Sequence, residues 1–531
     1  MPDGTALAKR RRTNGRTAAI LHVPVTRPVR RLAGLLVVLT VVLPACVPEV
    51  VAPTPPTGVS TSTAPPATAE PTLPPPAPAR WSDCGGGYQC AKVRVPRDYA
   101  DPSIGYLDVA LTMLPADDRE RRIGALLVNP GGPGGSGIDL VRDSVDAFPH
   151  LLRRRFDLVG FDPRGVNNST AVRCIDNLDP RAQLDPSPDD EAELRALVDD
   201  ARTYANACGD RNPDLLPYLS TAAVVQDLNR IRVALGEEKL TYLGFSYGTM
   251  IGALYADAFP ENVRALALDG AMDPSLSLLE LRADQARSFE DALGRFLDDC
   301  QRRRGCLFNH GNRTRQAFDR LMLDIDKSPL RAVSSNDPRK VGPGLAWGAI
   351  LGTMYAEAAW PALEWALFLA ERGDGSGFLA LSDPYRGRDK NGAYSNFQDA
   401  YTSNICLDYP SPTQIDDYTD LARSLTDDAP RFGQFVAYND LPCAFWPARA
   451  TGDPARVTGA GAPPIVVIGT TGDPATPMSW SRSLVDQLES AVLITHEGNG
   501  HTAFGVNDCV REAVKDYLID LDVPRNGLVC D

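Results

Sequence analysis

The hydrophobic pattern alternates between two kinds of segment over most of the chain. Short apolar runs rich in Val, Leu and Ile, bounded by Gly, Pro or Asp, are separated by segments with apolar residues at helical spacing. The short runs predict strands, and their alternation with helices is typical of an α/β fold with a mostly parallel sheet. The clearest candidate strands are residues 107–113, 125–129, 158–161, 240–245, 265–269, 465–469 and 492–495.

This alternation stops between residues 274 and 462. Apolar residues recur there at helical spacing, first over 289–300 and again over 347–369. A chain of 531 residues is also long for one compact core. We therefore expect a mainly helical cap over 274–462, inserted between two strands of a core made of 81–273 and 463–531.

The N-terminal segment has the features of an export signal. An apolar run of twelve residues, 32–43, follows Arg30 and Arg31 and is short for a membrane-spanning helix. The sequence LPAC then ends at Cys46 and resembles a bacterial lipoprotein cleavage box. We expect a signal peptide over 1–45 and a lipid on Cys46; an ordinary signal peptide cut nearby is the alternative.

A linker follows the signal. Residues 46–80 consist largely of Pro, Thr, Ala and Ser and contain few large apolar side chains. Such a segment cannot bury enough surface to fold, so we expect a disordered stalk that holds the domain away from the membrane.

The charge balance argues against nucleic acid as a partner. The whole chain has a net charge of −14, although residues 1–45 carry eight basic residues and one acidic residue. Without that segment 46 basic and 67 acidic residues remain, a net charge of −21. Such an acidic surface repels phosphate backbones and anionic headgroups, so we expect membrane contact only through the lipid anchor.

The cysteine count fits an exported protein. Eleven cysteines are present, and ten remain if Cys46 carries a lipid. Because disulfides persist outside the cytoplasm, we expect the cysteines nearest in sequence to pair. These pairs are Cys84 with Cys90, Cys174 with Cys208, Cys300 with Cys306, Cys406 with Cys443, and Cys509 with Cys530. Metal binding is the rival explanation, but no Cys and His spacing resembles a zinc site, and we expect neither a metal nor a cofactor.

A candidate nucleophile lies between a predicted strand and a predicted helix. Residues 244–248 read GFSYG and match G-x-S-x-G, with Ser246 at the centre. The apolar run 240–243 precedes the motif, and a helical pattern follows it to Phe259. This arrangement places a serine at a sharp, exposed corner, where the helix N-terminus favours developing negative charge. The alternative is a tight turn with an incidental serine.

A serine hydroxyl needs a base, and the base needs a carboxylate that orients it. In folds with this serine motif the acid follows the serine in sequence. The candidate strand 465–469 leads into the sequence TTGDP, which places Asp473 beyond the carboxyl end of a strand, where open α/β sheets hold their sites. Asp453 also lies in a GDP triplet, but no strand precedes it, so Asp473 is the better candidate.

Five histidines limit the choice of base. His22 belongs to the leader, and His150 and His310 precede the candidate acid. His496 ends the candidate strand 492–495, whereas His501 lies after it in the glycine-containing sequence EGNGHT. Because a loop beyond the last strand can carry an imidazole to the nucleophile, we predict that His501 is the base.

A glycine-dense turn follows the candidate strand 125–129. Its sequence, PGGPGGSG, allows backbone amides to approach a ligand closely, in the place where this kind of fold holds one oxyanion donor. We predict that the amides of Gly132 and Tyr247 form the oxyanion hole. A phosphate-binding loop is excluded because the lysine and Ser/Thr of a P-loop are missing, and no acidic residue follows at the distance of a ribose-binding site.

Several sequence blocks together resemble a known family. Between Trp81 and Cys530 the chain is similar to the secreted tripeptidyl aminopeptidases of actinobacteria, a branch of the proline-iminopeptidase group of α/β-hydrolases. The blocks are WSDCGGGYQCAKVRVPRDY, NPGGPGGSG, FDLVGFDPRG, GFSYGT, YADAFPENVRALALDGAMDP, GTTGDPATP and GHTAF. The resemblance implies the α/β-hydrolase fold, the triad Ser246, Asp473 and His501, and the oxyanion donors Gly132 and Tyr247. The chain departs from the family at residues 166–168, VNN, where a glycine is usual.

The resemblance also implies an exopeptidase that releases short peptides from free N-termini through an acyl-enzyme. Enzymes of this group recognise the substrate's α-amine with acidic side chains, usually from the cap. Asp408, in NICLDYP, is similar to a family segment and is the candidate amine-binding residue. Glu280, Glu357 and Glu364 remain open for the same role.

Two other functions compete with the peptidase. An esterase or lipase acting on cell-envelope lipids would use the same triad, because the triad serves esters and amides alike. A catalytically silent surface binding protein is the other class, and the complete set of catalytic elements argues against it. An epoxide or haloalkane hydrolase would need an aspartate in place of Ser246.

Overall fold

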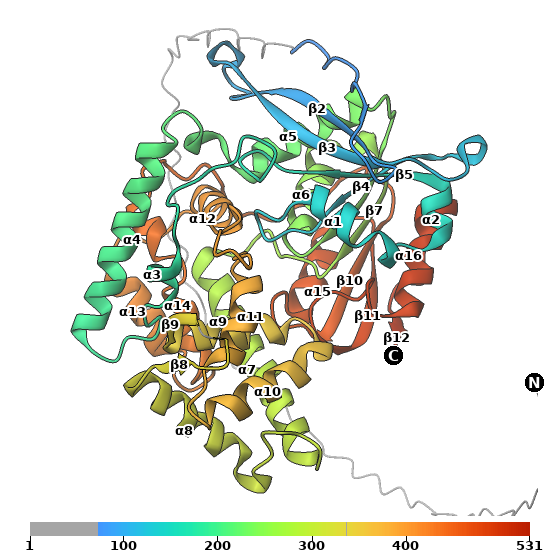
Figure 1. Cartoon of the computed structure of the whole chain (residues 1–531). Helices are drawn as coiled ribbons and strands as arrows, with labels where there is room; N and C mark the ends of the chain where they lie inside the picture. Colours follow the sequence, from blue (N-terminus) through green and yellow to red (C-terminus); the bar gives the residue numbers. More distant parts are fainter. Residues whose placement is uncertain (1–72, 336) are drawn as a thin grey trace, which may run out of the picture. The chain divides into compact units, whose positions relative to one another are not determined.

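A computed structural model describes residues 73–335 and 337–531 of the chain (Figure 1). The predicted signal peptide, Cys46 and the linker up to residue 72 lie outside the described residues. Residues 73–80 already contact the domain, since the amide of Ala79 donates to the carbonyl of Ala234 and Arg230 donates to the carbonyl of Pro74. The folded part therefore begins a few residues before the predicted start at Trp81.

The core is a 10-stranded sheet with the order β1-β2-β3-β5-β4-β6-β7-β10-β11-β12. All neighbours from β5 to β12 are parallel, whereas β1, β2 and β3 pair antiparallel with their neighbours. Every strand predicted from the hydrophobic pattern is present. The strands are β1 (Ser82–Asp83), β2 (Gln89–Pro96), β3 (Tyr106–Leu114), β4 (Gly124–Asn129), β5 (Phe156–Phe161), β6 (Leu240–Phe245), β7 (Val263–Asp269), β10 (Ile465–Gly472), β11 (Ala491–Asn499) and β12 (Leu528–Cys530).

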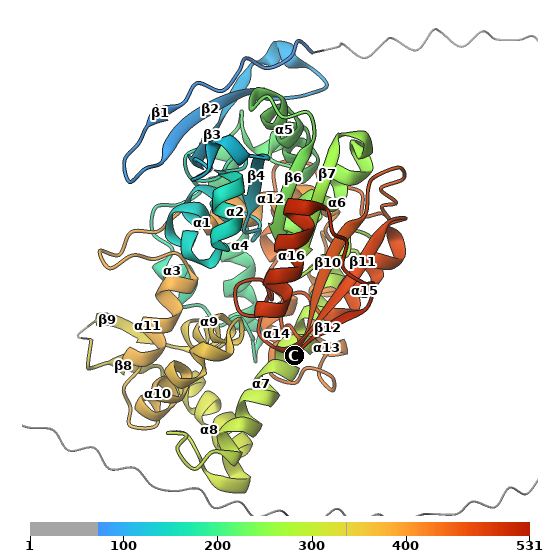
Figure 2. The same cartoon turned by 90° about the vertical axis from the view of Figure 1, so that its right-hand side faces the viewer.

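Helices cover both faces of this sheet (Figures 1 and 2). Alternate residues of a strand point to opposite faces, and in β4 Leu126 and Val128 pack in one core cluster while Leu127 packs in another. The first cluster includes residues of α1 (Gly137–Asp143), α2 (His150–Arg155) and α16 (Asp508–Asp520); the second includes α5 (Thr221–Ala234), α6 (Tyr247–Ala258) and α15 (Met478–Gln487). Burial on both faces explains why the central strands are continuous apolar runs.

The segment between β7 and β10 is mainly helical, and Figure 1 shows it below the sheet. It consists of α7 (Leu278–Arg302), α8 (Thr314–Lys327), β8 (Leu330–Ala332), β9 (Asp337–Val341), α9 (Pro343–Met354), α10 (Trp360–Ala370), α11 (Ser376–Tyr385), α12 (Phe397–Asp408), α13 (Ile415–Ser424) and α14 (Phe432–Ala437). The helical pattern over 347–369 is divided between α9 and α10. Pro361 is the reason, since proline is tolerated in the first turn of a helix but not in its interior.

A second part of the chain joins these helices. Between β5 and α5 the chain forms α3 (Asp179–Ala182) and α4 (Glu191–Arg211). Ala201 of α4 packs with Tyr418, Ala437, Tyr438 and Leu441 of the inserted segment. The cap is thus built from two separate stretches of sequence. The predicted cap, 274–462, does not include the first of them, which contains α3 and α4.

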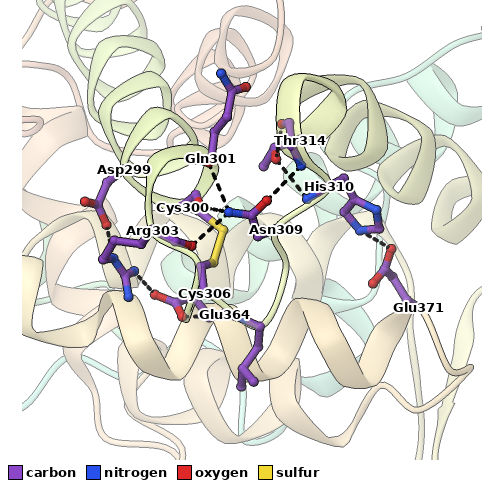
Figure 3. Close-up of a disulfide and its surroundings, with 12 residues drawn as sticks. Asp299, Cys300, Gln301, Arg303, Cys306, Asn309, His310, Thr314, Glu364 and Glu371 are labelled. Carbon is purple, nitrogen blue, oxygen red and sulfur yellow. Dashed lines mark hydrogen bonds and ion pairs between the residues drawn. A yellow bond between two sulfur atoms is a disulfide. The ribbon is translucent and has the colours of Figure 1, made fainter.

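All five predicted cysteine pairs are disulfides in the structure. Figure 3 shows the pair Cys300–Cys306, which closes the turn after α7. Asn309 supports the same turn by donating to the carbonyls of Cys300, Gln301 and Arg303. No helix within residues 73–335 and 337–531 is long and apolar enough to cross a membrane.

Candidate active site

Ser246 occupies a strained corner between β6 and α6. Its backbone φ is +54° and its ψ is −125°, a conformation that L-residues adopt rarely and that is typical of functional sites. The amide of Ser246 donates to the carbonyl of Asp269 at the end of β7, at 2.9 Å. The motif's glycines allow the corner, because a Cβ on Gly244 would lie 2.5 Å from the carbonyl oxygen of Gly248.

Asp473 and His501 meet at the carboxyl ends of β10 and β11. Nδ1 of His501 lies 2.9 and 3.0 Å from the two carboxylate oxygens of Asp473. The carboxylate also accepts bonds from the amides of Ala475 and Thr476 and from the Thr476 hydroxyl, each 2.9 Å long. These donors fix the carboxylate, which in turn holds the proton of His501 on Nδ1 and leaves Nε2 as the basic nitrogen.

The electrostatic surroundings favour the charged form of His501. Burial alone lowers its pKa, but the carboxylates of Asp473 and Asp269 raise it, and the net effect is a pKa above the ordinary value. Nε2 of His501 is buried and makes no hydrogen bond within residues 73–335 and 337–531. The Ser246 hydroxyl likewise makes none among these residues, and both side chains line the same cavity. The imidazole nitrogen and the hydroxyl are therefore unpaired among these residues and lie at the same cavity, as a base and a nucleophile must.

Asp269 holds the loop that carries His501, a role that sequence reasoning missed. Its buried carboxylate accepts the amides of Ala503 and Phe504 at 2.8 to 3.0 Å. Burial raises the pKa of Asp269 to about 6, although these two amides favour the charged form. On the other side of the loop the amide of His501 donates to the carbonyl of Tyr355, the residue after α9. The imidazole is thus positioned from the sheet and from the cap at once.

The glycine-dense turn after β4 presses against the first turn of α6. A Cβ on Gly131 would lie 2.6 Å from the amide nitrogen of Tyr247, so only glycine permits this approach. The amide of Gly132 donates no hydrogen bond to any of the described residues, and the first amides of a helix lack intrahelical acceptors. Gly132, Tyr247 and Ser246 all line the cavity. The geometry fits the predicted pair of oxyanion donors.

The sheet edge that carries Ser246, Asp473 and His501 is called the catalytic edge below. It opens into one cavity of about 630 Å³. Core residues at the sheet edge form one side of it, and residues of α3, α4, α7, α9, α11, α12, α14 and the neighbouring loops form the rest. Ligand cavities for small molecules and short peptides typically have volumes of roughly 300–1,000 Å³. The cap therefore encloses a binding space directly over Ser246.

Comparison with known proteins agrees with this architecture. A family model described as "TAP-like protein" matches residues 429–530. Serine protease Hip1 of Mycobacterium tuberculosis is 37% identical over 481 residues, which are 85% of this chain and 91% of that protein. Tripeptidyl aminopeptidase of Streptomyces coelicolor is 32% identical over 473 residues, 85% of each chain. The chain belongs to this TAP-like family of α/β-hydrolases.

The TAP-like enzyme is a serine hydrolase, as its fold and the names of these relatives indicate. A further relative, Carboxylesterase B of M. tuberculosis, is 37% identical over 453 residues, 83% of this chain and 86% of that protein. Family membership confirms the recognition made from the sequence blocks, and the α/β-hydrolase fold confirms the predicted class.

The amine-binding role predicted for Asp408 in the TAP-like hydrolase does not agree with the structure. Asp408 is buried and does not line the cavity. Its carboxylate accepts the amide and hydroxyl of Thr221 and the hydroxyl of Tyr247, each at 2.7 Å. Burial raises the pKa of Asp408 to about 6, although the hydrogen bonds from Tyr247 and Thr221 lower it. The residue supports Tyr247 from behind and offers no free oxygen to a substrate amine.

The other three candidate carboxylates also lie outside the cavity wall. Glu280 caps the N-terminus of α7, and Glu357 accepts from Asn499. Glu364 is buried and contacts Arg303 beside the Cys300–Cys306 disulfide (Figure 3). Among the described residues, Asp200 of α4 contributes the only carboxylate to the cavity wall. Its segment is not part of the predicted cap, so no sequence signal pointed to it.

Proposed function

We propose that this protein is an exopeptidase that releases short peptides, most simply tripeptides, from the free N-termini of peptides or proteins. The enclosed cavity over Ser246 carries the proposal, because its volume suits a segment of a few residues and not a folded chain. The relative named tripeptidyl aminopeptidase supports it. The acidic surface of the chain makes nucleic acid an unsuitable substrate.

The proposed reaction proceeds through an acyl-enzyme. The Ser246 hydroxyl attacks the scissile carbonyl while Nε2 of His501 takes its proton, and the amides of Gly132 and Tyr247 stabilise the oxyanion. The C–N bond breaks as His501 returns the proton to the leaving amine. Water then attacks the ester with His501 as base, which releases the peptide and regenerates Ser246.

Asp200 is the proposed partner of the substrate's α-amine. One of its carboxylate oxygens contacts Arg181, and the other accepts no hydrogen bond from the described residues. Burial raises the pKa of Asp200, and Arg181 opposes this effect. An ammonium group beside the free oxygen would favour the charged form further. This acid replaces Asp408 in the recognition of free N-termini.

The test compares three substrates: a tripeptide arylamide with a free amine, the same compound acetylated, and a short-chain aryl ester. We expect the free-amine peptide to be cleaved at least about tenfold better than the acetylated one, because a blocked terminus leaves the second oxygen of the Asp200 carboxylate without a partner. Asp200→Asn should reduce this preference. The matched control is Asp199→Asn, which alters the neighbouring acid of α4 that does not line the cavity.

Other outcomes of this assay would contradict particular parts of the proposal. Equal cleavage of the free and acetylated peptides removes amine recognition. Ester turnover without amide turnover favours an esterase acting on cell-envelope lipids, an alternative supported by the relative named Carboxylesterase B. Unchanged activity in Ser246→Ala would contradict the catalytic assignment, as would a fluorophosphonate label on another residue.

We also propose that the protein is held on the outer face of the cell membrane by a lipid on Cys46. Its five disulfides indicate export, because such bonds persist in oxidising compartments. The sequence LPAC supplies the attachment point. Metabolic labelling with a fatty acid should mark the wild-type protein and not Cys46→Ala, and the variant should appear in the medium. Equal labelling of both proteins would contradict the anchor.

A further inference from the structure

Arg386 is a cation in the cavity wall, and none of the described residues forms an ion pair with it. Three arginines line the cavity: Arg181, Arg282 and Arg386. Arg181 contacts Asp200, and Arg282 forms a buried ion pair with Asp440. No carboxylate forms an ion pair with Arg386 in the part of the chain that the structure describes. Arginine remains charged in proteins, so the cavity contains a guanidinium that no described carboxylate pairs directly, although Asp383 favours its charge from a greater distance.

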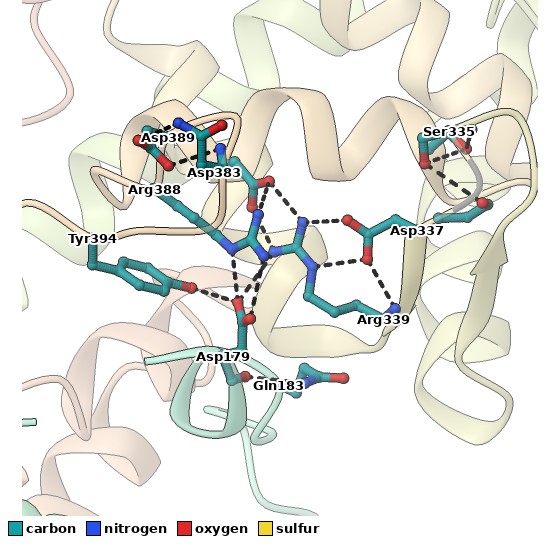
Figure 4. A network of polar contacts seen from close by, with 12 residues as sticks. Asp179, Gln183, Ser335, Asp337, Arg339, Asp383, Arg388, Asp389 and Tyr394 are labelled. Atoms are coloured by element: carbon teal, nitrogen blue, oxygen red, sulfur yellow. Dashed lines mark hydrogen bonds and ion pairs between the residues drawn. The ribbon is translucent and has the colours of Figure 1, made fainter. Parts of the chain in front are cut away.

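Two other arginines of the cap, unlike Arg386, do have carboxylate partners. Figure 4 shows Arg339 and Arg388 in a dense network of carboxylates that includes Asp383, the acid whose charge acts on Arg386. Arg339 contacts Asp179, Asp337 and Asp383, and Arg388 contacts Asp179 and Asp383. Tyr394, which lines the cavity, donates to Asp179 in the same network. The carboxylates of this network are therefore engaged with Arg339 and Arg388.

The guanidinium of Arg386 is held in a fixed position against α9. Nη2 donates to the carbonyl of Gly344 at 2.8 Å, and Nε lies 3.3 Å from the hydroxyl of Ser382. A Cβ on Gly348 would lie 3.0 Å from Nη2, so this glycine makes room for the group. The remaining nitrogen, Nη1, donates to none of the described residues and is not among their fully buried unpaired atoms. Nε and Nη2 therefore orient the guanidinium, and Nη1 is available to a ligand.

Helix α9 gives a scale for the distance to the catalytic edge. Its N-terminal half holds Arg386 through Gly344 and Gly348, and Tyr355 at its other end accepts the amide of His501. The positions differ by seven to eleven residues, which is roughly 10–16 Å at about 1.5 Å per residue. An extended peptide covers this distance with about three to five residues, at roughly 3.3 Å each. A group at Arg386 thus belongs to the third to fifth residue from the scissile bond, and the third is the last residue that a tripeptide acyl group supplies.

We propose that Arg386 binds a carboxylate of the substrate, the acidic side chain of the third residue on the acyl side of the scissile bond. In a tripeptide acyl group this residue is the N-terminal one, so the inference rests on the proposed peptidase function. Arg181, the partner of Asp200, is close enough to Arg386 to disfavour its charge. The amine of an N-terminal Glu would then meet Asp200 while its side chain meets Arg386. A carboxylate also offsets the burial that lowers the pKa of Arg386.

The test measures kcat/KM for arylamides of Glu-Ala-Ala and Gln-Ala-Ala. We expect the wild type to prefer Glu by about 10- to 100-fold, since hydrogen bonds between charged groups contribute this much. In Arg386→Gln the ratio should fall to about one, and in Arg386→Lys part of the preference should return. The matched control is Arg372→Gln, an exposed arginine of the same cap that does not line the cavity. It should keep the wild-type ratio.

A binding measurement separates this inference from the peptidase proposal. Calorimetry with Ser246→Ala and C-terminally amidated Glu-Ala-Ala and Gln-Ala-Ala needs no turnover, and the amide excludes the terminal carboxylate as the bound group. Tighter binding of the Glu peptide, lost in Ser246→Ala/Arg386→Gln, supports the site even if no arylamide is cleaved. Equal binding of the two peptides overturns it. A preference for Glu that survives Arg386→Gln overturns it too. So does tighter binding of amidated Ala-Glu-Ala in place of amidated Glu-Ala-Ala.

Discussion

The catalytic edge of the sheet and the cap wall of the cavity are built in different ways. At the edge, acidic side chains are fixed by backbone amides: Asp473 accepts from Ala475 and Thr476, and Asp269 accepts from Ala503 and Phe504. In the cap wall, long side chains hold one another, as in the contact of Arg282 with Asp440. These backbone donors belong to the loops that directly follow β10 and β11, whereas side-chain partners can be exchanged without altering the fold.

We expect the catalytic edge to determine the rate of the reaction and the cap wall to determine which substrates are preferred. A change at the edge should alter the rate for every substrate by a similar factor, because all substrates share the reacting carbonyl. A change in the wall should alter the ratio between substrates. Substitutions of single residues test this division.

Ser246→Ala removes the nucleophile and should have the largest effect. We expect kcat/KM to fall by about 10⁴- to 10⁶-fold for peptide and ester substrates alike, the range found when serine triads lose this residue. The measurement is steady-state kinetics with thermal unfolding of the same sample. An unchanged melting temperature would show that the fold is intact, whereas a loss confined to one substrate class would contradict a shared nucleophile.

Asp473→Asn should follow, with a loss of about 10³- to 10⁴-fold. The amide nitrogen would face Nδ1 of His501 and favour the wrong tautomer. The carboxylate raises the pKa of His501, so the wild type should lose activity as the pH falls through a value above the ordinary one, because the base must be neutral. In the variant this acid limb should move to lower pH. An acid limb at the same pH in both proteins would show that another group titrates.

The pattern of the chain predicted the sheet and the strands whose ends carry Ser246, Asp473 and His501, for a local reason. Ser246, Asp473 and His501 each follow a strand whose apolar run is visible in sequence, and strands of a parallel sheet end at one edge. The five disulfides were also predictable, since each joins two cysteines that follow one another in the order of cysteines along the chain.

The cap wall was not predictable because its contacts are distant in sequence. Asp200 lies in α4, outside the expected cap, and meets the cavity only through packing against residues more than 200 positions away. Asp408 was chosen from a similar sequence block, yet its direction depends on Thr221 and Tyr247 from two core helices. Local pattern fixes where a helix lies along the chain but not which of its faces meets the substrate.

Asp269→Asn should have an intermediate effect. An asparagine accepts through one oxygen, so one of the amides of Ala503 and Phe504 would face an NH₂ group and the His501 loop would shift. We expect kcat to fall by about 10- to 100-fold with little change in KM, since the imidazole and not the cavity is displaced. Kinetics on free and acetylated peptides provide the check. A change in their ratio would place Asp269 in substrate recognition.

Tyr247→Phe should have the smallest effect and gives the most direct test of the corrected role of Asp408. The backbone amide of Tyr247 remains, so oxyanion stabilisation persists, while Asp408 loses one of its three donors. We expect unfolding to require about 1–2 kcal/mol less, the usual contribution of a buried hydrogen bond to a charged group, and activity to change less than about threefold. Chemical denaturation and kinetics measure the two effects. Because Asp408 does not reach the cavity, free and acetylated peptides should be affected equally; a selective loss of the free-amine peptide would return Asp408 to the substrate site.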